Sequence, residues 1–478
     1  MSTITIAWIA LPFFLGFVIY LLPQVDRYLA LGVALVSLGY GLQVFFQESP
    51  LTLGLLDNFG VTLVVDQLSG YFILTNALVT MAVILYCWHS DKTAFFYTQI
   101  IILHGSVNSA FVSGDFISSY VALEVIGIAA FLLIAYPRTN RSIWVALRYL
   151  FVSNTAMLFY LVGVVLVYQA NHSFAFAGLG NAPKEAIALI FLGLLTKGGI
   201  FVSGLWLPLT HSESETPVSA MLSGVVVKTG VFPLVRCALM LEEIDPIIRI
   251  FGVATIVLGV VCAIFEQDTK RTLALSTISQ LGWIMAAPAV GGLYALAHGL
   301  VKSSLFLIAG NLPSRNFQEL QDKPMNIRVW IVLVMASLSI SGFPLFVGFG
   351  AKMLTLQNVS PWQEIIMNVA AVGTAMVFAK FIFLPHEKLE LGGKFKPTFW
   401  LAMILLIGGL ITANTLYLEA YTIANITKSL AIIAGGWLGY FLIVRRVAIK
   451  LPRVLEQLEH LIGVMSLMLL LLLGLILA

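Results

Sequence analysis

The sequence predicts an all-α polytopic membrane protein with about 14–16 transmembrane helices. Of its 478 residues, 60% are hydrophobic and only 10% are charged, and the mean hydropathy is +0.98. A soluble domain carries about 25% charged residues. Apolar runs of roughly 20 residues, long enough to cross a hydrocarbon core of about 30 Å as helices, recur along the whole chain. The distribution of basic residues between loops supports the same class.

Sixteen apolar runs are predicted to span the membrane. The first, "ITIAWIALPFFLGFVIYLLP", has no basic residue before it and many spans after it, so it is interpreted as a helix and not as a signal peptide. The longest loops, near 47–66, 169–183, 312–326 and 385–397, are too short to fold alone. The predicted spans lie near residues 4–23, 28–46, 67–88, 94–112, 116–136, 143–168, 184–208, 217–241, 245–265, 271–290, 292–311, 327–356, 361–384, 398–418, 423–444 and 459–477.

Basic residues alternate between the loops. The loops after even-numbered spans, with their flanks, hold only Lys184, Arg249 and Lys428. The positive-inside rule therefore places the loops after odd-numbered spans in the cytoplasm and both termini outside. Those loops contain 16 of the 26 lysines and arginines: Arg27, Lys92, Arg138, Arg141, Lys270, Arg271, Arg315, Lys323, Arg328, Lys388, Lys394, Lys396, Arg445, Arg446, Lys450 and Arg453.

Two predicted spans look discontinuous. Span 184–208 runs into Pro208 and the polar "THSESETP", and span 327–356 contains "SISGFPLFVGFGAK". Broken helices recur at corresponding points of inverted repeats in transporters. Because Lys197 and Lys352 each lie beside one break, we expect two five-helix repeats of opposite orientation. The predicted division is 1–93 for the N-terminal helices, 94–241 for the first repeat, 245–384 for the second and 398–478 for the C-terminal helices.

Four lysines lie deep within predicted spans: Lys197, Lys228, Lys302 and Lys352. Lys197 is thirteen residues into its span, which is about 20 Å along a helix axis. A charge at such depth costs on the order of 2.5–3.5 kcal/mol, so four of them would cost roughly 10 kcal/mol. Such a cost indicates a function for these ammonium groups.

Glu124, in "DFISSYVALEVIGIAAFLLIAY", is a carboxylate at comparable depth. Attraction to it would favour a charged lysine, while burial would favour the neutral amine. A lysine balanced between the two effects can exchange a proton near neutral pH, whereas the alternative is a static ion pair that pins two helices. His298 lies four residues before Lys302 on the same helix face, so it could be a proton relay or a hydrogen-bonded packing residue.

Other polar residues in or near the spans favour structural roles. Arg236 and Lys380 lie near helix ends, from which they can reach water by snorkelling. Glu213 and Glu215 could be general acid/base groups or a cation-attracting mouth, but capping of the helix that starts near 217 is favoured. Two further carboxylates at helix starts are also interpreted as caps: Asp66 and Asp115.

The sequence lacks the motifs of several enzyme and metal-site classes. There is no HExxH, no GxSxG elbow, no P-loop and no His/Cys cluster. The three cysteines, Cys87, Cys237 and Cys262, lie in apolar runs and imply no disulfide framework. The formal charge of +3 is too small to indicate a nucleic-acid partner. We therefore expect no catalytic centre, cofactor or metal in this chain.

Five motifs occur in order between about residues 60 and 385. "KGGIFVSGLWLPLTHSESETPVSAMLSGVVVKTGVFPLVR" resembles the lysine-bearing broken helix and the next helix of the proton-conducting antiporter-like family. That family comprises the large membrane subunits of respiratory complex I, related hydrogenases and Mrp-type sodium/proton antiporters. "DFISSYVALEVIGIAAFLLIAY" resembles its glutamate helix, "DTKRTLALSTISQLGWIMAA" and "ALAHGLVKSSLFLIAG" resemble its next helices, and "GFPLFVGFGAK" resembles its second broken helix. The last two spans exceed the usual fourteen-helix core.

The resemblance implies a subunit of a multisubunit sodium/proton antiporter in the cell membrane, with other membrane subunits as partners. "RYLFVSNTAMLFYLVGVVLVY" looks most like the Mrp D-type subunit. Two alternatives are a proton-pumping module of a quinone-reducing or hydrogen-evolving complex and a non-transporting scaffold subunit. The resemblance also implies proton-transfer roles for Glu124, Lys197, Lys228, His298, Lys302 and Lys352.

Overall fold

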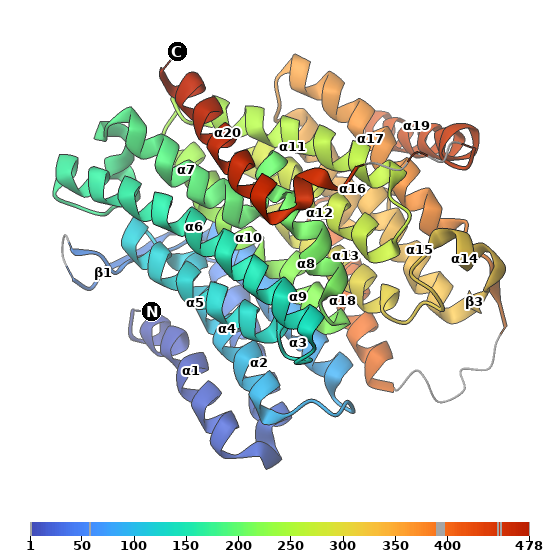
Figure 1. Ribbon diagram of the computed structural model, residues 1–478, viewed down its shortest axis with the longest axis horizontal. Helices are drawn as coiled ribbons and strands as arrows, with labels where there is room; N and C mark the ends of the chain where they lie inside the picture. The colour runs from blue at the N-terminus through green and yellow to red at the C-terminus, as the bar shows by residue number, and fades with distance from the viewer. Residues whose placement is uncertain (1, 57–58, 389–396, 447–448, 450–451, 478) are drawn as a thin grey trace.

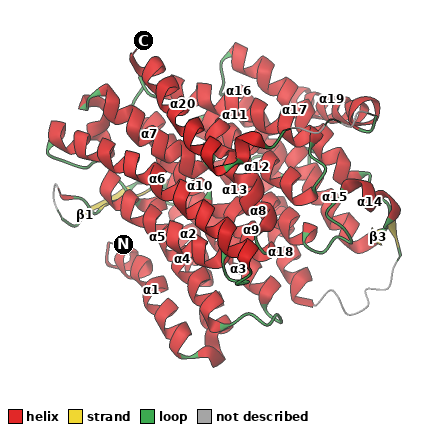
Figure 2. Ribbon diagram, viewed as in Figure 1, coloured by secondary structure: helices red, strands yellow, loops and turns green. Residues whose placement is uncertain are grey.

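The computed structural model describes residues 2–56, 59–388, 397–446, 449 and 452–477, and it is a bundle of helices (Figures 1 and 2). The strands form two short pairs, β1 (Leu51–Gly54) with β2 (Thr62–Val65), antiparallel, and β3 (Met325–Asn326) with β4 (His386–Glu387), parallel. The α-helices are α1 (Ser2–Leu21), α2 (Asp26–Phe45), α3 (Gln67–Cys87), α4 (Ala94–Val112), α5 (Phe116–Ile134), α6 (Asn140–Asn171), α7 (Lys184–Gly198), α8 (Leu207–Glu213), α9 (Thr216–Met221), α10 (Lys228–Met240), α11 (Asp245–Phe265), α12 (Thr269–Ala286), α13 (Gly291–Ala309), α14 (Phe317–Asp322), α15 (Ile327–Ser341), α16 (Val347–Gln357), α17 (Pro361–Ile382), α18 (Pro397–Asn414), α19 (Ile423–Gly439) and α20 (Leu458–Leu477).

The described part of the chain contains 14 helical segments that are long and apolar enough to cross a membrane. They correspond to 14 of the sixteen predicted spans. The other two predicted spans are also helical: α12 is less apolar but buried throughout, and α15 and α16 form a broken pair. The protein is therefore a multi-pass, all-α membrane protein, as the sequence predicts.

The loops gather at two ends of the bundle, as the alternation of basic residues predicts. At the basic end, side chains of different loops pair with one another: Lys92 with Glu215, Arg141 with Glu213, Arg315 with Asp268, and Arg271 with Glu456. At the other end, the contacts are Asp115 with Thr62, Arg236 with Asp66, Arg249 with Asn358, and Lys428 with Glu364. Three of the basic residues in the prediction, Lys394, Lys396 and Lys450, lie outside the described residues.

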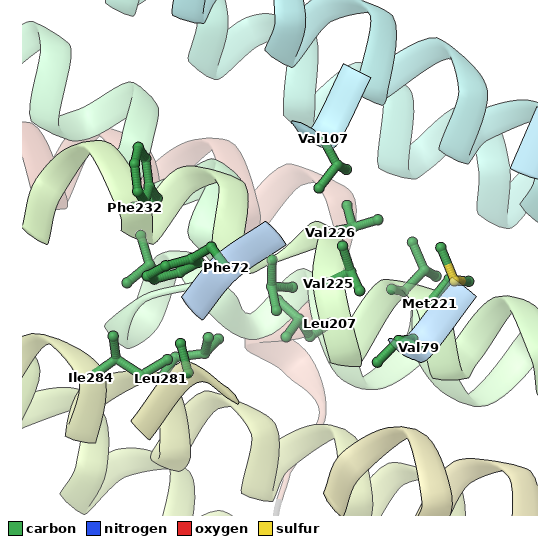
Figure 3. Close-up of a cluster of buried hydrophobic side chains, with 14 of the residues drawn as sticks. Phe72, Val79, Val107, Leu207, Met221, Val225, Val226, Phe232, Leu281 and Ile284 are labelled. Carbon is green, nitrogen blue, oxygen red and sulfur yellow. The ribbon is translucent and has the colours of Figure 1, made fainter. Parts of the chain in front are cut away.

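The helices that carry the deep lysines occupy the middle of the bundle. Every residue of α12 and of α13 is buried. Figure 3 shows apolar side chains of α3, α4, α8, α9, α10 and α12 packed together in this core, including Phe72, Phe232 and Leu281. The helices α1 and α19 expose large apolar side chains outward, while α20 packs along α7 (Figure 1). Charges on the central helices consequently face protein and not lipid.

The first broken helix ends earlier than predicted. Gly199 adopts φ +71°, and its N–H bonds to the Thr196 carbonyl at 3.1 Å, while the Ile200 N–H bonds to the Leu195 carbonyl at 2.8 Å. This is a Schellman cap, which requires the left-handed conformation that glycine adopts without strain. A 3₁₀ segment, Phe201–Trp206, then leads into α8. The predicted interruption of this span is confirmed and lies beside Lys197, but it falls at Gly199 and not at Pro208, since a proline in the first turn of a helix sacrifices no hydrogen bond.

The second broken helix ends with the same cap. Gly342 adopts φ +92°, its N–H bonds to the Ser339 carbonyl at 3.0 Å, and the Phe343 N–H bonds to the Leu338 carbonyl at 2.9 Å. The chain then crosses to Val347, where α16 begins. The break lies at Gly342, within the motif that predicted it.

A third interruption separates α9 from α10 and was not predicted. Residues Leu222–Val226 form a π-turn that ends two residues before Lys228. The backbone passes close to α13 here, since a Cβ built on Gly224 would lie 2.1 Å from Ser303 Oγ. Such π-turns occur mostly as single turns and are frequent at functional sites.

Candidate proton-transfer site

Lys197 lies in the last turn of α7 and is only 4% exposed. Its Nζ donates a hydrogen bond of 2.6 Å to Ser153 Oγ on α6. A Cβ built on Gly127 of α5 would lie 3.1 Å from the same nitrogen, so glycine leaves room for the ammonium there. The cation is held by a neutral hydroxyl and not by a carboxylate.

Glu124 lies one turn before Gly127 on α5 and is partly exposed. Among the described residues it forms no ion pair with Lys197, and its Oε1 is buried without a hydrogen-bond partner. The Lys197 ammonium instead lies against Gly127, one helical turn further along α5. The static ion pair, which the sequence left open as an alternative, is absent among the described residues, where Ser153 is the hydrogen-bond partner of the ammonium.

Lys228 is the first residue of α10 and is fully buried. Its Nζ donates to the Gly224 carbonyl at 2.6 Å and to the Ser223 carbonyl at 3.2 Å. Both acceptors belong to the π-turn, which orients backbone carbonyls toward the lysine. The interruption that the sequence did not reveal thus supplies the oxygen atoms that stabilise Lys228.

His298 and Lys302 lie one turn apart on α13, as predicted. Lys302 Nζ donates to the Leu273 carbonyl at 2.9 Å and to Ser276 Oγ, and it lies 5.3 Å from the centre of the Phe378 ring. Both ring nitrogens of His298 are buried without a hydrogen-bond partner. A Cβ built on Gly299, next to His298, would lie 3.6 Å from Lys228 Cε, so Lys228 approaches the same turn of α13 from the neighbouring helix.

Lys352 lies in α16 and is 3% exposed. Its Nζ has no hydrogen-bond partner in the described chain and lies 5.3 Å from the centre of the Trp283 ring. A small cavity is lined by Lys352, His298, Gln280 and Tyr294, among others. The cavity connects the second broken helix with α13, so Lys352 and His298 face a common space.

Four of the site residues lie near one another, whereas Lys197 lies apart from them. Lys228 and Lys302 both lie beside the turn of α13 that carries His298, and Lys352 shares the cavity with His298. No hydrogen bond among the described residues joins Lys197 to Lys228. Their helices nevertheless touch, because a Cβ built on Gly230 would lie 2.4 Å from the Gly198 nitrogen. Buried polar groups without partners are normally satisfied by water or by movement.

Two basic residues expected to snorkel are instead bound within the protein. Arg236 is 6% exposed and pairs with Asp66 at 2.8 Å. Lys380 is 5% exposed and donates to the carbonyls of Ala263 and Glu266, each at 2.8 Å. The prediction failed because acceptors contributed by distant parts of the chain cannot be read from helix position.

Glu213 and Glu215 do not cap a helix through their side chains. Glu215 occupies the N-cap position of α9 but makes no side-chain cap, and it binds Lys92 at 2.6 Å. Glu213 pairs with Arg141 at 3.2 Å. Both carboxylates tie loops together at the basic end of the bundle.

Asp66 and Asp115 are caps, as predicted. Asp66 accepts from the Ser69 N–H at 2.9 Å, and Asp115 accepts from the Ser118 N–H at 2.7 Å. Both side chains also bind a second element, since Asp66 pairs with Arg236 and Asp115 accepts from the Thr62 N–H. Their roles are structural.

Residues 113–378, more than half of the chain, match the family described as "NADH:quinone oxidoreductase/Mrp antiporter, TM". The N-type subunit of an NADH-quinone oxidoreductase from Desulforudis audaxviator is 30% identical over 68% of this chain and 72% of that protein. The D-type subunit of a Na(+)/H(+) antiporter from Alkalihalophilus pseudofirmus is 26% identical over 79% of this chain and 85% of that protein.

Two solved structures share the fold. A chain of the membrane-bound sulfane sulfur reductase, an archaeal respiratory membrane complex, has a TM-score of 0.78 at 21% identity and covers 92% of this chain and 99% of that chain. A chain of the Mrp complex from Dietzia sp. DQ12-45-1b also has a TM-score of 0.78, at 22% identity, and covers 99% of this chain and 59% of that chain. With five ordered motifs and two broken helices, this chain belongs to the NADH:quinone oxidoreductase/Mrp antiporter transmembrane family.

Proposed function

We propose that this protein is the proton-translocating membrane subunit of a multisubunit sodium/proton antiporter in the cell membrane. The observation that supports the proposal is the set of hydrogen-bond partners of the four deep lysines. Among the described residues, none of the four lies in an ion pair, and three bind neutral hydroxyl or carbonyl oxygens. A buried lysine without a carboxylate partner can lose its proton without leaving an uncompensated negative charge.

In the proposed path, Glu124 modulates the protonation of Lys197 through its charge. A proton then passes to Lys228, through the region of His298 and Lys302, and on to Lys352. Water supplies the step from Lys197 to Lys228, where the helices touch but no side-chain hydrogen bond within the described chain links the two ammonium groups. The complete path comprises Glu124, Lys197, Lys228, His298, Lys302 and Lys352.

The chain's two broken helices support the proposal of two related units. Residues 94–241 and 245–384 would be five-helix repeats of opposite orientation, and the identical Schellman caps at Gly199 and Gly342 support this relation. The end of the bundle that gathers the basic loops would face the cytoplasm, with both termini outside.

A second candidate is favoured by the relative that is 30% identical, whose name is that of an NADH-quinone oxidoreductase subunit. In that case the same lysines would move protons while other subunits carry the redox chemistry. A scaffold role is disfavoured, since a scaffold gains nothing from four buried ammonium groups that cost roughly 10 kcal/mol to insert.

The test is sodium-driven proton flux in vesicles that contain the intact complex but neither NADH nor quinone. The antiporter proposal predicts flux in the unmodified protein and its loss in Lys197→Ala with the complex still assembled. No sodium-dependent flux, together with proton pumping once a redox substrate is added, would establish the second candidate. Full flux in Lys197→Ala would contradict both.

A further inference from the structure

The break at Gly342, between α15 and α16, is contacted by residues that follow the family match, which ends at residue 378. Ser429, on α19, is 2% exposed, and its Oγ donates a hydrogen bond of 2.6 Å to the Gly342 carbonyl. That carbonyl lies past the end of α15, so the following helical turn cannot supply an N–H to it. A hydroxyl from a neighbouring helix satisfies it instead.

A second contact holds the other side of the same break. The Leu345 N–H donates to Tyr421 Oη at 2.8 Å, and Asn414 Nδ2 donates to the same oxygen at 2.6 Å. Leu345 adopts φ +97°, a conformation that is strained for a residue with a side chain and that persists only where the surroundings enforce it. The Tyr421 ring also packs against Phe349 of α16, with centroids 4.7 Å apart.

These contacts adjoin Lys352 directly. A Cβ built on Gly342 would lie 3.1 Å from Lys352 Cδ and 3.7 Å from Ser429 Oγ. The lysine side chain therefore runs along the backbone that Ser429 holds. A shift of the Gly342 carbonyl would therefore change the packing around the Lys352 side chain.

Docking of α19 onto the bundle does not depend on this hydroxyl. The helix α19 lies beside α17 (Figure 1), and a Cβ built on Gly436 would lie 2.4 Å from Ala375 Cβ, which shows how closely the two helices pack there. Lys428 adds an ion pair of 2.7 Å with Glu364 on α17. The bond from Ser429 thus acts on the break, while other contacts position the helix.

We propose that Ser429 and Tyr421 are positioning residues for Lys352. By fixing the break at Gly342–Phe346 they hold the ammonium group at the cavity that it shares with His298. The inference rests on the proposed proton path and adds a role for the first of the two helices that exceed the fourteen-helix core.

The test compares variants of the intact complex in vesicles by the rate of proton flux and its pH profile. Ser429→Ala is expected to lower flux roughly three- to tenfold, the effect of one lost hydrogen bond, and to shift the pH of half-maximal flux. Ser429→Thr keeps the hydroxyl and should restore both. The matched control is Thr427→Ala on the same helix, whose hydroxyl bonds only within α19 and whose loss should change neither.

Tyr421→Phe supplies a second readout. It removes the acceptor of the Leu345 N–H, so amide hydrogen exchange at Leu345 should accelerate while exchange in α17 stays unchanged. Wild-type flux and pH profile in Ser429→Ala, or equal losses in Ser429→Ala and Ser429→Thr, would overturn the inference. Lys352→Ala distinguishes failure of the proton path from failure of the positioning role. Normal flux in Lys352→Ala contradicts the proton path itself. Loss of flux in Lys352→Ala together with normal flux in Ser429→Ala contradicts only the positioning role.

Discussion

The two broken helices end in the same cap but are supported differently. At the first break, Trp206 Nε1 donates to the Thr196 carbonyl at 2.9 Å, so the broken segment closes on itself. One neighbour assists, since the Phe201 N–H donates to Thr255 Oγ1 of α11 at 3.0 Å. The second break depends on Ser429 and the segment before it. Local sequence thus sets the cap, while the tertiary structure sets how the freed backbone is satisfied.

The lysines beside the breaks differ in the same way. Lys197 precedes its break, is bound to Ser153 and lies against α5 one helical turn from Glu124. Lys352 follows its break and has no hydrogen-bond partner in the described chain. The comparison indicates a first lysine whose proton is stabilised by polar neighbours and a second whose position depends mainly on the backbone around it.

The largest effect on proton flux is expected when Lys352 is replaced by a residue that keeps the positive charge but cannot release a proton. Lys352→Arg keeps a cation at the site, but a guanidinium does not release its proton in a protein. If Lys352 acts by exchange, flux should be abolished in Lys352→Arg as completely as in Lys352→Ala. Flux in vesicles is the measurement, with assembly of the complex as the control. Wild-type flux in Lys352→Arg would mean that the charge alone is needed.

The next largest effect is expected in the unfolding temperature when the two capping glycines, Gly199 and Gly342, are replaced by alanine. Each lies at positive φ, where a Cβ costs about 1–2 kcal/mol. A Cβ on Gly199 would also lie 2.3 Å from Leu207 Cδ1, whereas one on Gly342 would meet Lys352 Cδ at 3.1 Å. Gly199→Ala should therefore lower the thermal unfolding temperature more than Gly342→Ala.

The control for these glycines is Gly408→Ala on α18, where nothing lies within 4 Å of a built Cβ. Its unfolding temperature should equal that of the wild type or rise slightly, because alanine favours helix more than glycine does. Equal stability of Gly199→Ala and Gly408→Ala would contradict the role assigned to the first cap.

An effect smaller than that of Gly199→Ala, which adds a clash with Leu207 to the backbone strain, is expected at Thr255. Thr255→Val keeps the shape of the side chain but leaves the Phe201 N–H without its acceptor, at a cost of about 1–3 kcal/mol. Thr255→Ser retains the oxygen and should remain close to the wild type in stability and flux. Chemical denaturation of the detergent-solubilised complex and vesicle flux are the two measurements. A Val variant as stable as the Ser variant would show that the first break is closed by Trp206 alone.

The smallest stability effect is expected at Glu124. Breaking a buried ion pair costs about 3–5 kcal/mol, but Glu124 makes no such pair with Lys197. Glu124→Gln should leave the unfolding temperature nearly unchanged and should lower flux less than Lys197→Ala does. A large fall in unfolding temperature would indicate that the two residues pair directly.

Much of this architecture could be predicted from sequence, because a helix that crosses a membrane must be long and apolar and its loops obey a charge asymmetry. The cap at Gly342 was also predictable, since the chain there combines a glycine and a proline within an apolar run. The π-turn before Lys228 left no such sign, because "LSGVV" is compatible with a continuous helix. The turn lies in close contact with α13, which only the folded chain reveals.

The candidate site was predictable as residues but not as contacts. Charges deep in apolar runs are conspicuous, so the lysines and His298 could be identified. Their partners are hydroxyls and carbonyls from helices distant in sequence, such as Ser153 for Lys197 and Leu273 for Lys302. Serines and backbone carbonyls are too common for their pairing to be inferred from spacing.

The central claim is that buried lysines take up and release the transported protons, and Lys228 tests it most directly because it lies in the middle of the proposed path. The measurement is sodium-driven proton flux in vesicles containing the intact complex with Lys228→Met, which fills similar space without a titratable group. The account predicts an assembled complex without proton flux. Flux at the wild-type rate in that complex would contradict it.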